Sequence, residues 1–327
     1  MKQTLEKPEL FKLISTELSI VEENLTSKLP AKSSLLKEII SYIFNAGGKR
    51  FRPALSLLIA KATGKIDKKH IILCELTELI HTASLIHDDI IDSSKLRRGR
   101  ETVNSLWNDK ISVITGDFLF AQASVRLGEL ENTEIVKIYA KVLSDLCDGE
   151  IEQYASLFNP NITWEQYLQK SMTKTASLFA AACKSAAMLN NQDKDIINQA
   201  EKFGNYLGIA FQIIDDTLDF TSSVKKSGKE VAADLKQGII TAPVLFALQV
   251  NDERAKQIKT LIENRFNNND KDFDKALRLV HEFGGCEKAK ELANDYLNNA
   301  KNNLSFIKDF KIKNSLNQIA NCIISRE

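Results

Sequence analysis

Few residues in this sequence would interrupt a helix. Only five of its 327 residues are proline, the strongest helix breaker, and long uninterrupted segments lie between them. The alternating β-branched pattern that marks strands does not appear in these segments. We therefore expect an all-α fold. Because no segment has the composition of a linker, one domain over residues 1–327 is the simplest prediction.

Several other features are also missing. The formal net charge is +1, so the chain has no global field that would attract nucleic acid or anionic lipid. Its five cysteines form no CxxC pair, which argues against a zinc site or a disulfide framework and suits a reducing compartment. No apolar run approaches the length of about 20 residues that spans a bilayer, and the first ten residues are partly acidic where a signal peptide is apolar. These absences predict a soluble, untargeted protein without an integral membrane segment or a nucleic-acid partner.

Local signals predict where helices begin and end. The apolar periodicity indicates one long helix over residues 69–91. Thr163 followed by Gln166 is typical of a capping box, which would open a helix that runs through the alanine-rich stretch near residue 180. Asn132 and Asp193 indicate similar helix starts. Turn formers and charges predict breaks in four segments: 95–101, 158–162, 222–228 and 267–270.

Two acidic clusters of the same form stand inside otherwise apolar stretches. Each has two adjacent aspartates and a third one helical turn later: Asp88, Asp89 and Asp92 in the first cluster; Asp215, Asp216 and Asp219 in the second. The first and last aspartates of a cluster lie about 40° apart on a helix, so the three carboxylates share roughly one face. Like charges held together repel one another, and Mg²⁺, which prefers carboxylate oxygen, removes that cost. Two facing clusters are expected to clamp several metal ions around one anion.

Basic and polar residues lie close to both clusters. The segment 95–100 follows the first cluster and is rich in arginine, whose guanidinium group binds diphosphate oxygens in a bidentate manner. Three cations at positions 49, 50 and 52 stand on a glycine-containing turn before an expected helix start, which predicts a second anion site. His81 lies about 20° from Asp88 in helical phase, so both are expected to point into one cavity. Gln212 shares the helical face of Asp215.

Each of these features has an ordinary structural alternative. A single aspartate cluster is more often a solvated or ion-paired surface, and a basic run is usually a solvated loop. His81 alone would be a core histidine with a backbone partner. Gly204 and Gly208, which continue the face of the second cluster, are more often helix packing than space for a ligand. The duplicated acidic motif and the shared helical phase of its neighbours favour a site.

Five segments, taken in order, resemble the trans-isoprenyl diphosphate synthase family, the polyprenyl synthetases. They are GGKRFRP, HTASLIHDDIIDSSKLRRG, SMTKTASLF, AFQIIDDTLDF and GKEVAADLKQG. Their order and spacing match the family from about residue 40 to 250. The resemblance implies an isoprenoid synthase helical bundle around a deep central cavity, usually a homodimer, with the two aspartate motifs on opposing helices.

The resemblance also implies roles for individual residues. The positions that hold Mg²⁺ against the allylic diphosphate match Asp88, Asp92 and Asp215, with Asp89, Asp216 and Asp219 in support. The isopentenyl diphosphate site matches Lys49, Arg52, His81 and Arg98. The allylic side matches Arg97, Lys174, Thr175, Gln212 and Lys229. One departure is Glu101, where many members have proline; we expect it to alter the loop rather than the chemistry.

The implied reaction makes physical sense of these residue types. Mg²⁺ and basic side chains neutralise the charge that develops on a departing diphosphate, so an allylic carbocation forms. The double bond of isopentenyl diphosphate attacks this cation, and a proton is then lost to the released diphosphate, because no dedicated base stands out in the sequence. Water would quench the cation, which explains an apolar cavity wall.

Product length depends on the residues four and five positions before the first cluster, where bulky aromatics stop elongation early in this family. Here they are Ser84 and Ala83, both small, which favours a long product over farnesyl diphosphate. The segments TASLIHDDIID, VNSLW, GDFLFAQAS and DLKQGIITAPVLFAL are similar to the solanesyl-type synthases of cyanobacteria and plastids, which supply plastoquinone side chains. A bacterial cytoplasm or a plastid stroma is therefore expected. Geranylgeranyl diphosphate stays an alternative product, since residues deeper in the tunnel can close it.

Two other classes of protein stay open as alternatives. A class I terpene cyclase also ionises allylic diphosphates, but it need not carry GGKRFRP and LRRG for a second diphosphate, and both are present. A non-catalytic prenyltransferase subunit would be expected to have lost aspartates from one cluster, and both are intact. A purely structural helical protein would leave six inward carboxylates without partners.

Overall fold

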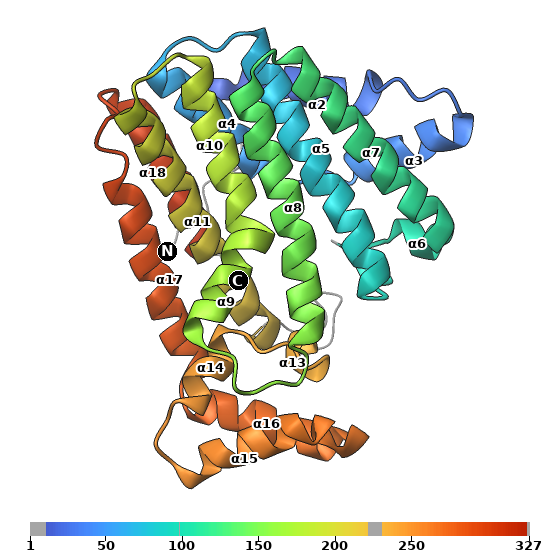
Figure 1. Cartoon of the computed structure of the whole chain (residues 1–327), viewed down its shortest axis with the longest axis vertical. Coiled ribbons are helices and arrows are strands. Elements are labelled where there is room, and N and C mark those ends of the chain that lie inside the picture. The colour runs from blue at the N-terminus through green and yellow to red at the C-terminus, as the bar shows by residue number, and fades with distance from the viewer. Residues whose placement is uncertain (1–10, 98, 222–230, 326–327) are drawn as a thin grey trace. The chain divides into compact units, whose positions relative to one another are not determined.

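The computed structural model describes residues 11–97, 99–221 and 231–325, and these residues are almost entirely helical (Figure 1). The expected all-α fold is confirmed. The chain divides into two compact units, each built from segments that lie far apart in the sequence. The first takes residues up to Ala140, Ala180–Glu201 and Asn303–Ile319; the second takes Lys141–Phe179, Lys202–Asn302 and residues from Ala320. The expected single domain stays a prediction.

The first unit is organised around one long helix, α5. Its complete elements are η1 (Lys12–Ile14), α2 (Ser15–Ser27), α3 (Ser34–Asn45), α4 (Phe51–Thr63), α5 (Lys68–Ile91), β1 (Leu96–Arg97), β2 (Arg100–Glu101), α6 (Val103–Leu106) and α7 (Asp109–Glu129). Helices α2, α4 and α7 pack against α5. Every side chain from Ile72 to Ile80 is consequently buried, including two glutamates. The apolar periodicity predicted one buried face, but this part of α5 is buried on all sides.

The second unit holds the shorter helices that follow. Its complete elements are α9 (Trp164–Ser171), η2 (Met172–Ala176), α13 (Ala233–Lys236), α14 (Ala242–Leu248), α15 (Glu253–Glu263), η3 (Arg265–Asn268), α16 (Asp270–Glu282) and α17 (Gly285–Asn302). Four long helices contribute residues to both units: α8 (Thr133–Ala155), α10 (Ser177–Leu189), α11 (Lys194–Thr221) and α18 (Phe310–Ile324). None of the helices in the described ranges combines the length and the apolarity that a bilayer crossing needs.

Most of the predicted helix boundaries are confirmed. The long helix expected over residues 69–91 begins one residue earlier, after Asp67, whose side chain accepts a hydrogen bond from the backbone of His70. The Thr163 hydroxyl accepts from the Gln166 backbone and the Gln166 side chain accepts from the Thr163 backbone, which is the predicted capping box. The side chains at positions 132 and 193 likewise cap α8 and α11. The predicted break at 222–228 lies outside the described residues.

Two local predictions are confirmed, and the structure adds detail to each. The helix that opens at Thr163 is not continuously α-helical, because residues 172–176 form a π-helical segment, η2, between α9 and α10. Such segments insert one residue into a helix and often mark functional sites. The expected break at 95–101 is a small antiparallel hairpin in which Arg97 pairs with Arg100. Gly99 stands at its tip with φ +76°, a conformation that glycine adopts at little cost.

Close packing in the second unit requires a small residue at position 208. A Cβ atom there would lie 2.5 Å from the Ala176 Cα atom of η2, so only glycine lets α11 approach this closely. The helix-packing interpretation of Gly208 is confirmed. One turn further along α11 stands Gln212, which this approach brings against the π-helical segment.

Candidate active site

The first aspartate cluster lies at the C-terminal end of α5, in the first unit. Asp88 and Asp89 belong to the last helical turn and Asp92 is the C-cap residue. Asp89 is buried, whereas Asp88 and Asp92 are half-buried. The cluster therefore separates into one inner carboxylate and two outer ones.

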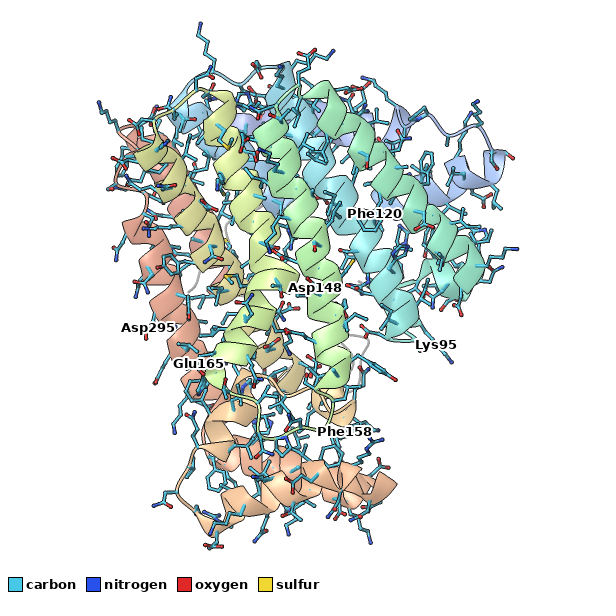
Figure 2. All side chains as sticks on the ribbon, viewed as in Figure 1. Lys95, Phe120, Asp148, Phe158, Glu165 and Asp295 are labelled. Atoms are coloured by element: carbon cyan, nitrogen blue, oxygen red, sulfur yellow. The ribbon has the colours of Figure 1, made fainter. Side chains whose placement is uncertain are left out.

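The inner carboxylate of this cluster holds an arginine in place. Arg97 Nε donates to Asp89 Oδ1 at 2.7 Å, and the Asp89 carbonyl accepts from the Ser94 backbone at 2.8 Å. These bonds tie the hairpin to the end of α5, just beyond which Lys95 lies (Figure 2). Arg98 lies outside the described residues. Glu101, at the position where many members of the resembled family have proline, lies in β2 and pairs with Leu96 of β1.

A cleft in the first unit brings several predicted residues together. Side chains of α3, α5 and the hairpin line it, with residues of the turn between α3 and α4. The predicted residues among them are His81, Asp89 and Arg97. His81 thus shares this cleft with the inner aspartate of the cluster. His81 was assigned to one diphosphate and Arg97 to the other, and that division stays a prediction.

The turn before α4 carries the predicted second group of cations. Gly47 has φ +69° and Arg50, the N-cap residue, has φ +50°. Arg50 is buried and its Nη1 atom lies 2.5 Å from Glu78 Oε1 on α5. Lys49 beside it is exposed, with its Nζ atom 5.8 Å from the centre of the Phe51 ring. Arg52, in the first turn of α4, is half-buried.

The second aspartate cluster lies near the C-terminal end of α11, in the second unit, and shows the same separation. Asp216 is buried, Asp215 is exposed and Asp219 is half-buried. Tyr167 Oη donates to Asp216 Oδ2 at 2.6 Å, and Gln212 Nε2 donates to Asp216 Oδ1 at 2.7 Å. The inner carboxylate is again held by the protein.

The third aspartate of this cluster fixes the chain that follows. The Asp219 carboxylate accepts from the backbone N–H groups of Ala233 and Asp234, at 3.2 and 3.1 Å. These groups belong to the first turn of α13, where a carboxylate satisfies N–H donors that have no partner within the helix. Asp219 therefore anchors α13 to the end of α11. Lys229 lies outside the described residues.

Burial controls the protonation of the inner carboxylate. Desolvation raises the pKa of Asp216 to about 6, and the nearby Lys170 opposes this increase. Burial also lowers the pKa of Lys170. Because the Asp216 pKa is higher in the folded protein than in the unfolded chain, folding takes up a proton between about pH 4 and 6. The contribution of Asp216 to stability consequently falls as the pH rises through that window.

The π-helical segment presents the two predicted residues of the allylic side. Thr175 Oγ1 donates to Gln212 Oε1 at 2.5 Å, so the threonine orients the amide that in turn contacts Asp216. Lys174 Nζ lies 2.5 Å from Glu150 Oε1 of α8. Threonine, glutamine, aspartate and tyrosine thus form one continuous hydrogen-bonded chain.

The relatives of this chain identify its family. Residues 33–280 match the polyprenyl synthetase family. The chain belongs to that family. It is 43% identical over 316 residues to a prenyl transferase of Cyanophora paradoxa, covering 96% of each chain. It is 42% identical over 309 residues to the chloroplastic solanesyl diphosphate synthase 1 of Arabidopsis thaliana, covering 93% of this chain and 75% of that protein.

Solved structures agree with this assignment. A polyprenyl synthase from Caulobacter crescentus, complexed with calcium and isoprenyl diphosphate, is similar with a TM-score of 0.91 at 29% identity, and 98% of each chain is covered. Heptaprenyl diphosphate synthase from Staphylococcus aureus gives a TM-score of 0.90 at 32% identity, covering 95% of this chain and 98% of that one. The expected polyprenyl synthetase family and its all-α fold are therefore confirmed.

The two residues whose small size is expected to allow a long product in this polyprenyl synthetase lie on α5. Ala83 is fully buried. Ser84 is half-buried, and its Oγ atom donates to the His81 carbonyl at 2.9 Å. Both side chains are small, so a bulky residue at either position would extend into space beyond that of the native side chain.

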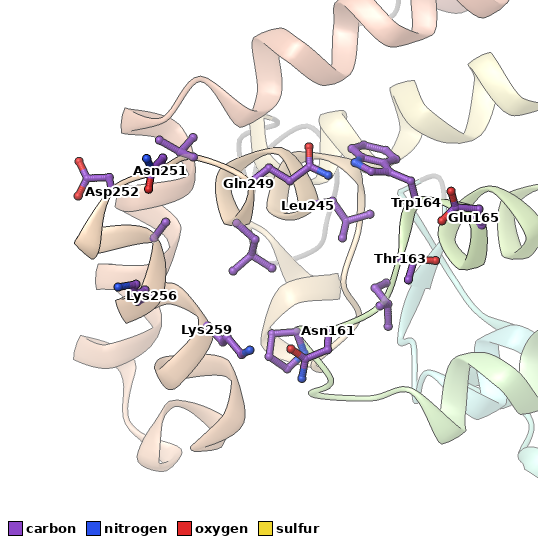
Figure 3. A pocket seen from close by; sticks show the side chains of 15 residues that line it. Asn161, Thr163, Trp164, Glu165, Leu245, Gln249, Asn251, Asp252, Lys256 and Lys259 are labelled. Carbon is purple, nitrogen blue, oxygen red and sulfur yellow. The ribbon is translucent and has the colours of Figure 1, made fainter.

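A wider cleft lies elsewhere in the second unit of this polyprenyl synthetase. It has a volume of about 570 Å³ and lies between the loop 160–163 with the start of α9 on one side and α14, α15 and their connection on the other. Lys256 and Lys259 of α15 and Asn161 of the loop extend along its walls (Figure 3). None of the described residues with a predicted catalytic or binding role lines it.

Sequence reasoning missed the partners of the inner aspartates. Tyr167 is buried and contacts Asp216 from a helix 49 residues earlier, and no acidic or basic pattern surrounds it in the sequence. Arg50 was noted only as one of three cations, whereas the structure separates it from its neighbours by burying it against Glu78. In the described part of the chain, no group of three or more His, Cys, Asp or Glu side chains is already arranged to hold a metal ion.

Proposed function

We propose that this polyprenyl synthetase condenses isopentenyl diphosphate with an allylic diphosphate, making a long-chain all-trans polyprenyl diphosphate and releasing diphosphate. The observation that carries the proposal is the shared design of the two aspartate clusters. In each, the inner carboxylate is buried and hydrogen-bonded by the protein, while the first aspartate is more accessible. Relatives named solanesyl and decaprenyl diphosphate synthases support a long product.

The accessible carboxylates fit a divalent cation. Asp88, Asp92 and Asp215 supply hard oxygen donors, the type that Mg²⁺ prefers. We propose these three as ligands of Mg²⁺, with several ions per active site, and the calcium complex of the Caulobacter synthase supports a divalent cation. When bound, the metal stabilises the negative charge of the departing diphosphate.

The inner aspartates act on the protein rather than on the metal. Asp89 holds the Arg97 side chain through its Nε atom. Asp216 holds the Gln212 amide, which Thr175 also fixes. Groups fixed in this way need no reorganisation as charge develops on the substrate, which is the main source of electrostatic catalysis.

Separate sets of basic and polar residues are proposed to bind the two diphosphates. We propose that Lys49, Arg52, His81 and Arg98 bind isopentenyl diphosphate, and that Arg97, Lys174, Thr175, Gln212 and Lys229 bind the allylic diphosphate. With the cation formed, the double bond of isopentenyl diphosphate adds to it, and the released diphosphate accepts the proton that is lost. An apolar cavity wall would exclude water from the cation.

A product assay tests this proposal. Purified protein is incubated with labelled isopentenyl diphosphate, Mg²⁺ and, separately, geranyl, farnesyl and geranylgeranyl diphosphate, and the products are sized by chromatography. We expect elongation to chains longer than C20 that stops when the metal is chelated. A C20 product would identify a geranylgeranyl diphosphate synthase instead. Cyclic hydrocarbons formed without isopentenyl diphosphate would identify a terpene cyclase, and no turnover would identify a non-catalytic subunit.

Assembly and location are part of the same proposal. We propose a homodimer, as the family resemblance implies, and a bacterial cytoplasm or plastid stroma as its compartment. Relatives from Synechocystis and from chloroplasts support these compartments. The substrates are small diphosphates, and with a net charge of +1 the chain offers no global attraction for nucleic acid.

The length of the product is expected to depend on Ala83. In Ala83→Phe, an aromatic ring added at a fully buried position blocks the path of the growing chain, so we expect the main product to lose several isoprene units. Chromatography of the dephosphorylated products measures the change. Ala181→Phe, at a comparably buried position of α10, reports the effect of overpacking alone and should change yield without changing length. An unchanged product distribution in a folded Ala83→Phe protein would contradict the steric argument.

A further inference from the structure

Helix α5 carries two buried glutamates, each paired with an arginine from another helix. The Glu75 carboxylate lies 2.6 Å from Arg126 Nε of α7, and the Glu78 carboxylate lies 2.5 Å from Arg50 Nη1 at the start of α4. Both glutamates have almost no solvent exposure, 3% and 5%. Two chemically similar ion pairs therefore stand one helical turn apart, but only Glu78 lines the cleft that contains His81 and Arg97.

The pair with Glu78 fixes an unusual backbone conformation. Arg50 has φ +50° and ψ +31°, the left-handed region, which is unfavourable for a non-glycine residue. Its guanidinium group is held by Glu78 and by Glu22 of α2, whose Oε1 atom lies 3.4 Å from Arg50 Nε. The Arg50 carbonyl accepts the first hydrogen bond of α4, from the Ala54 backbone at 3.0 Å. The side chain thus anchors the point where the turn becomes a helix.

The anchored residue stands between two of the predicted diphosphate-binding cations. Lys49 precedes Arg50 and Arg52 follows it after one residue, so the backbone conformation at position 50 sets the directions of both side chains. Arg50 turns inward to Glu78, whereas Lys49 is exposed at the surface of the turn and Arg52 lies in the first turn of α4. A change in the Arg50 conformation would displace both cations together.

We propose that Glu78 is a positioning residue for the isopentenyl diphosphate site: acting through Arg50, it holds the turn that presents Lys49 and Arg52. This inference rests on the proposed function and deepens it. Glu78 itself need not touch the substrate, because a buried carboxylate beside an anion would repel it.

The negative charge of Glu78 distinguishes a positioning role from a direct electrostatic effect on the substrate, because the two predict opposite changes in KM when that charge is removed. Glu78→Gln removes a negative charge from a cleft proposed to bind an anion, so Coulomb attraction alone predicts tighter binding and a lower KM. The positioning role predicts the opposite. In Glu78→Gln the buried Arg50 charge keeps only the weaker and more exposed contact with Glu22, so the turn reorganises and the KM for isopentenyl diphosphate rises.

The test compares Glu78→Gln with Glu75→Gln, a matched control on the same helix with the same burial and the same kind of partner. For Glu78→Gln we expect the KM for isopentenyl diphosphate to rise at least tenfold, with kcat and the KM for the allylic primer within threefold of wild type. For Glu75→Gln we expect all three constants within threefold. A folded Glu78→Gln protein whose KM for isopentenyl diphosphate is unchanged or lower would overturn the proposal, as would an equal increase in both variants.

Two further measurements keep the test decisive. If Glu78→Gln does not fold, the double variant Arg50→Met/Glu78→Met replaces the pair with apolar side chains of similar length, which is often tolerated, and it must show the same rise in KM. Calorimetric titration with inorganic diphosphate compares binding to wild type, Glu78→Gln and Glu75→Gln without turnover. A wild type without elongating activity would reject the proposed function, whereas equal diphosphate binding by all three proteins would reject the positioning role alone.

Discussion

Replacing Asp88 with alanine is expected to lower the kcat/KM of chain elongation by at least about 1000-fold, or about 4 kcal/mol of transition-state stabilisation. Asp88 is one of the carboxylates proposed to hold the metal that neutralises the departing diphosphate. Without it the diphosphate would have to leave with much of its charge uncompensated. Saturating Mg²⁺ should not restore the rate, because the ligand itself is missing.

The stability of this variant should change far less than its activity. Asp88 is half-buried in the last turn of α5, and its backbone carbonyl accepts the capping N–H group of Asp92, a bond that alanine keeps. Alanine also favours the helix. We expect the free energy of unfolding to change by no more than about 1 kcal/mol, as measured by urea denaturation followed by circular dichroism.

A matched control separates a lost ligand from a lost surface charge. Asp117→Ala removes an aspartate from the neighbouring helix α7, where the side chain is 66% exposed. We expect its kcat/KM to stay within threefold of wild type. If Asp88→Ala keeps more than about a tenth of the wild-type rate at saturating Mg²⁺, or if Asp117→Ala loses as much activity, the proposed ligand role is wrong.

The parts of the site that follow from local spacing could be predicted from the sequence. Helical periodicity predicted the extent of α5, so the first aspartate cluster falls at its C-terminal end. Capping residues such as Thr163 act within one turn, so their partners are always nearby in the sequence. These features depend on residues three or four positions apart, which is the range over which helix geometry is fixed.

The partners of the inner aspartates could not be predicted in the same way. Asp216 is held by Tyr167, and the choice of that tyrosine depends on which helix packs against α11. Helical phase gives the face on which Asp216 stands but not the neighbour that covers it. The close packing of Gly208 against Ala176 of the π-helical segment is likewise a tertiary contact, which helical phase does not give.

The buried charged residues were the feature that could least be predicted from the sequence. An apolar face was expected on α5, yet the helix is buried on all sides between Ile72 and Ile80, and two charged residues lie within that stretch. A fully covered helix can contain glutamate only if another element supplies a cation, since an isolated buried carboxylate is costly. Arg50, the N-cap residue of α4, and Arg126 of α7 do so. One of these pairs borders the cleft, and the other is purely structural.

The structural pair gives the second large expected effect. Arg126→Ala should destabilise the protein by about 3–5 kcal/mol, because it leaves the Glu75 carboxylate buried without its cation. The Glu75 side chain is only 4% exposed, and its remaining partner is the neutral side chain of Asn24, which donates at 2.5 Å. Chemical denaturation of both proteins measures the difference.

Two variants show whether the buried charge is the cause. Glu129→Ala removes the other carboxylate that Arg126 contacts: Glu129 Oε1 lies 3.1 Å from Arg126 Nη1, and the Glu129 side chain is 43% exposed. The free energy of unfolding should fall by less than about 1 kcal/mol, because exposed ion pairs contribute little to stability. Adding Glu75→Leu to Arg126→Ala removes the buried charge and should recover much of the lost stability. If the double variant is no more stable than Arg126→Ala, lost packing of the arginine side chain, rather than an uncompensated carboxylate, accounts for the destabilisation.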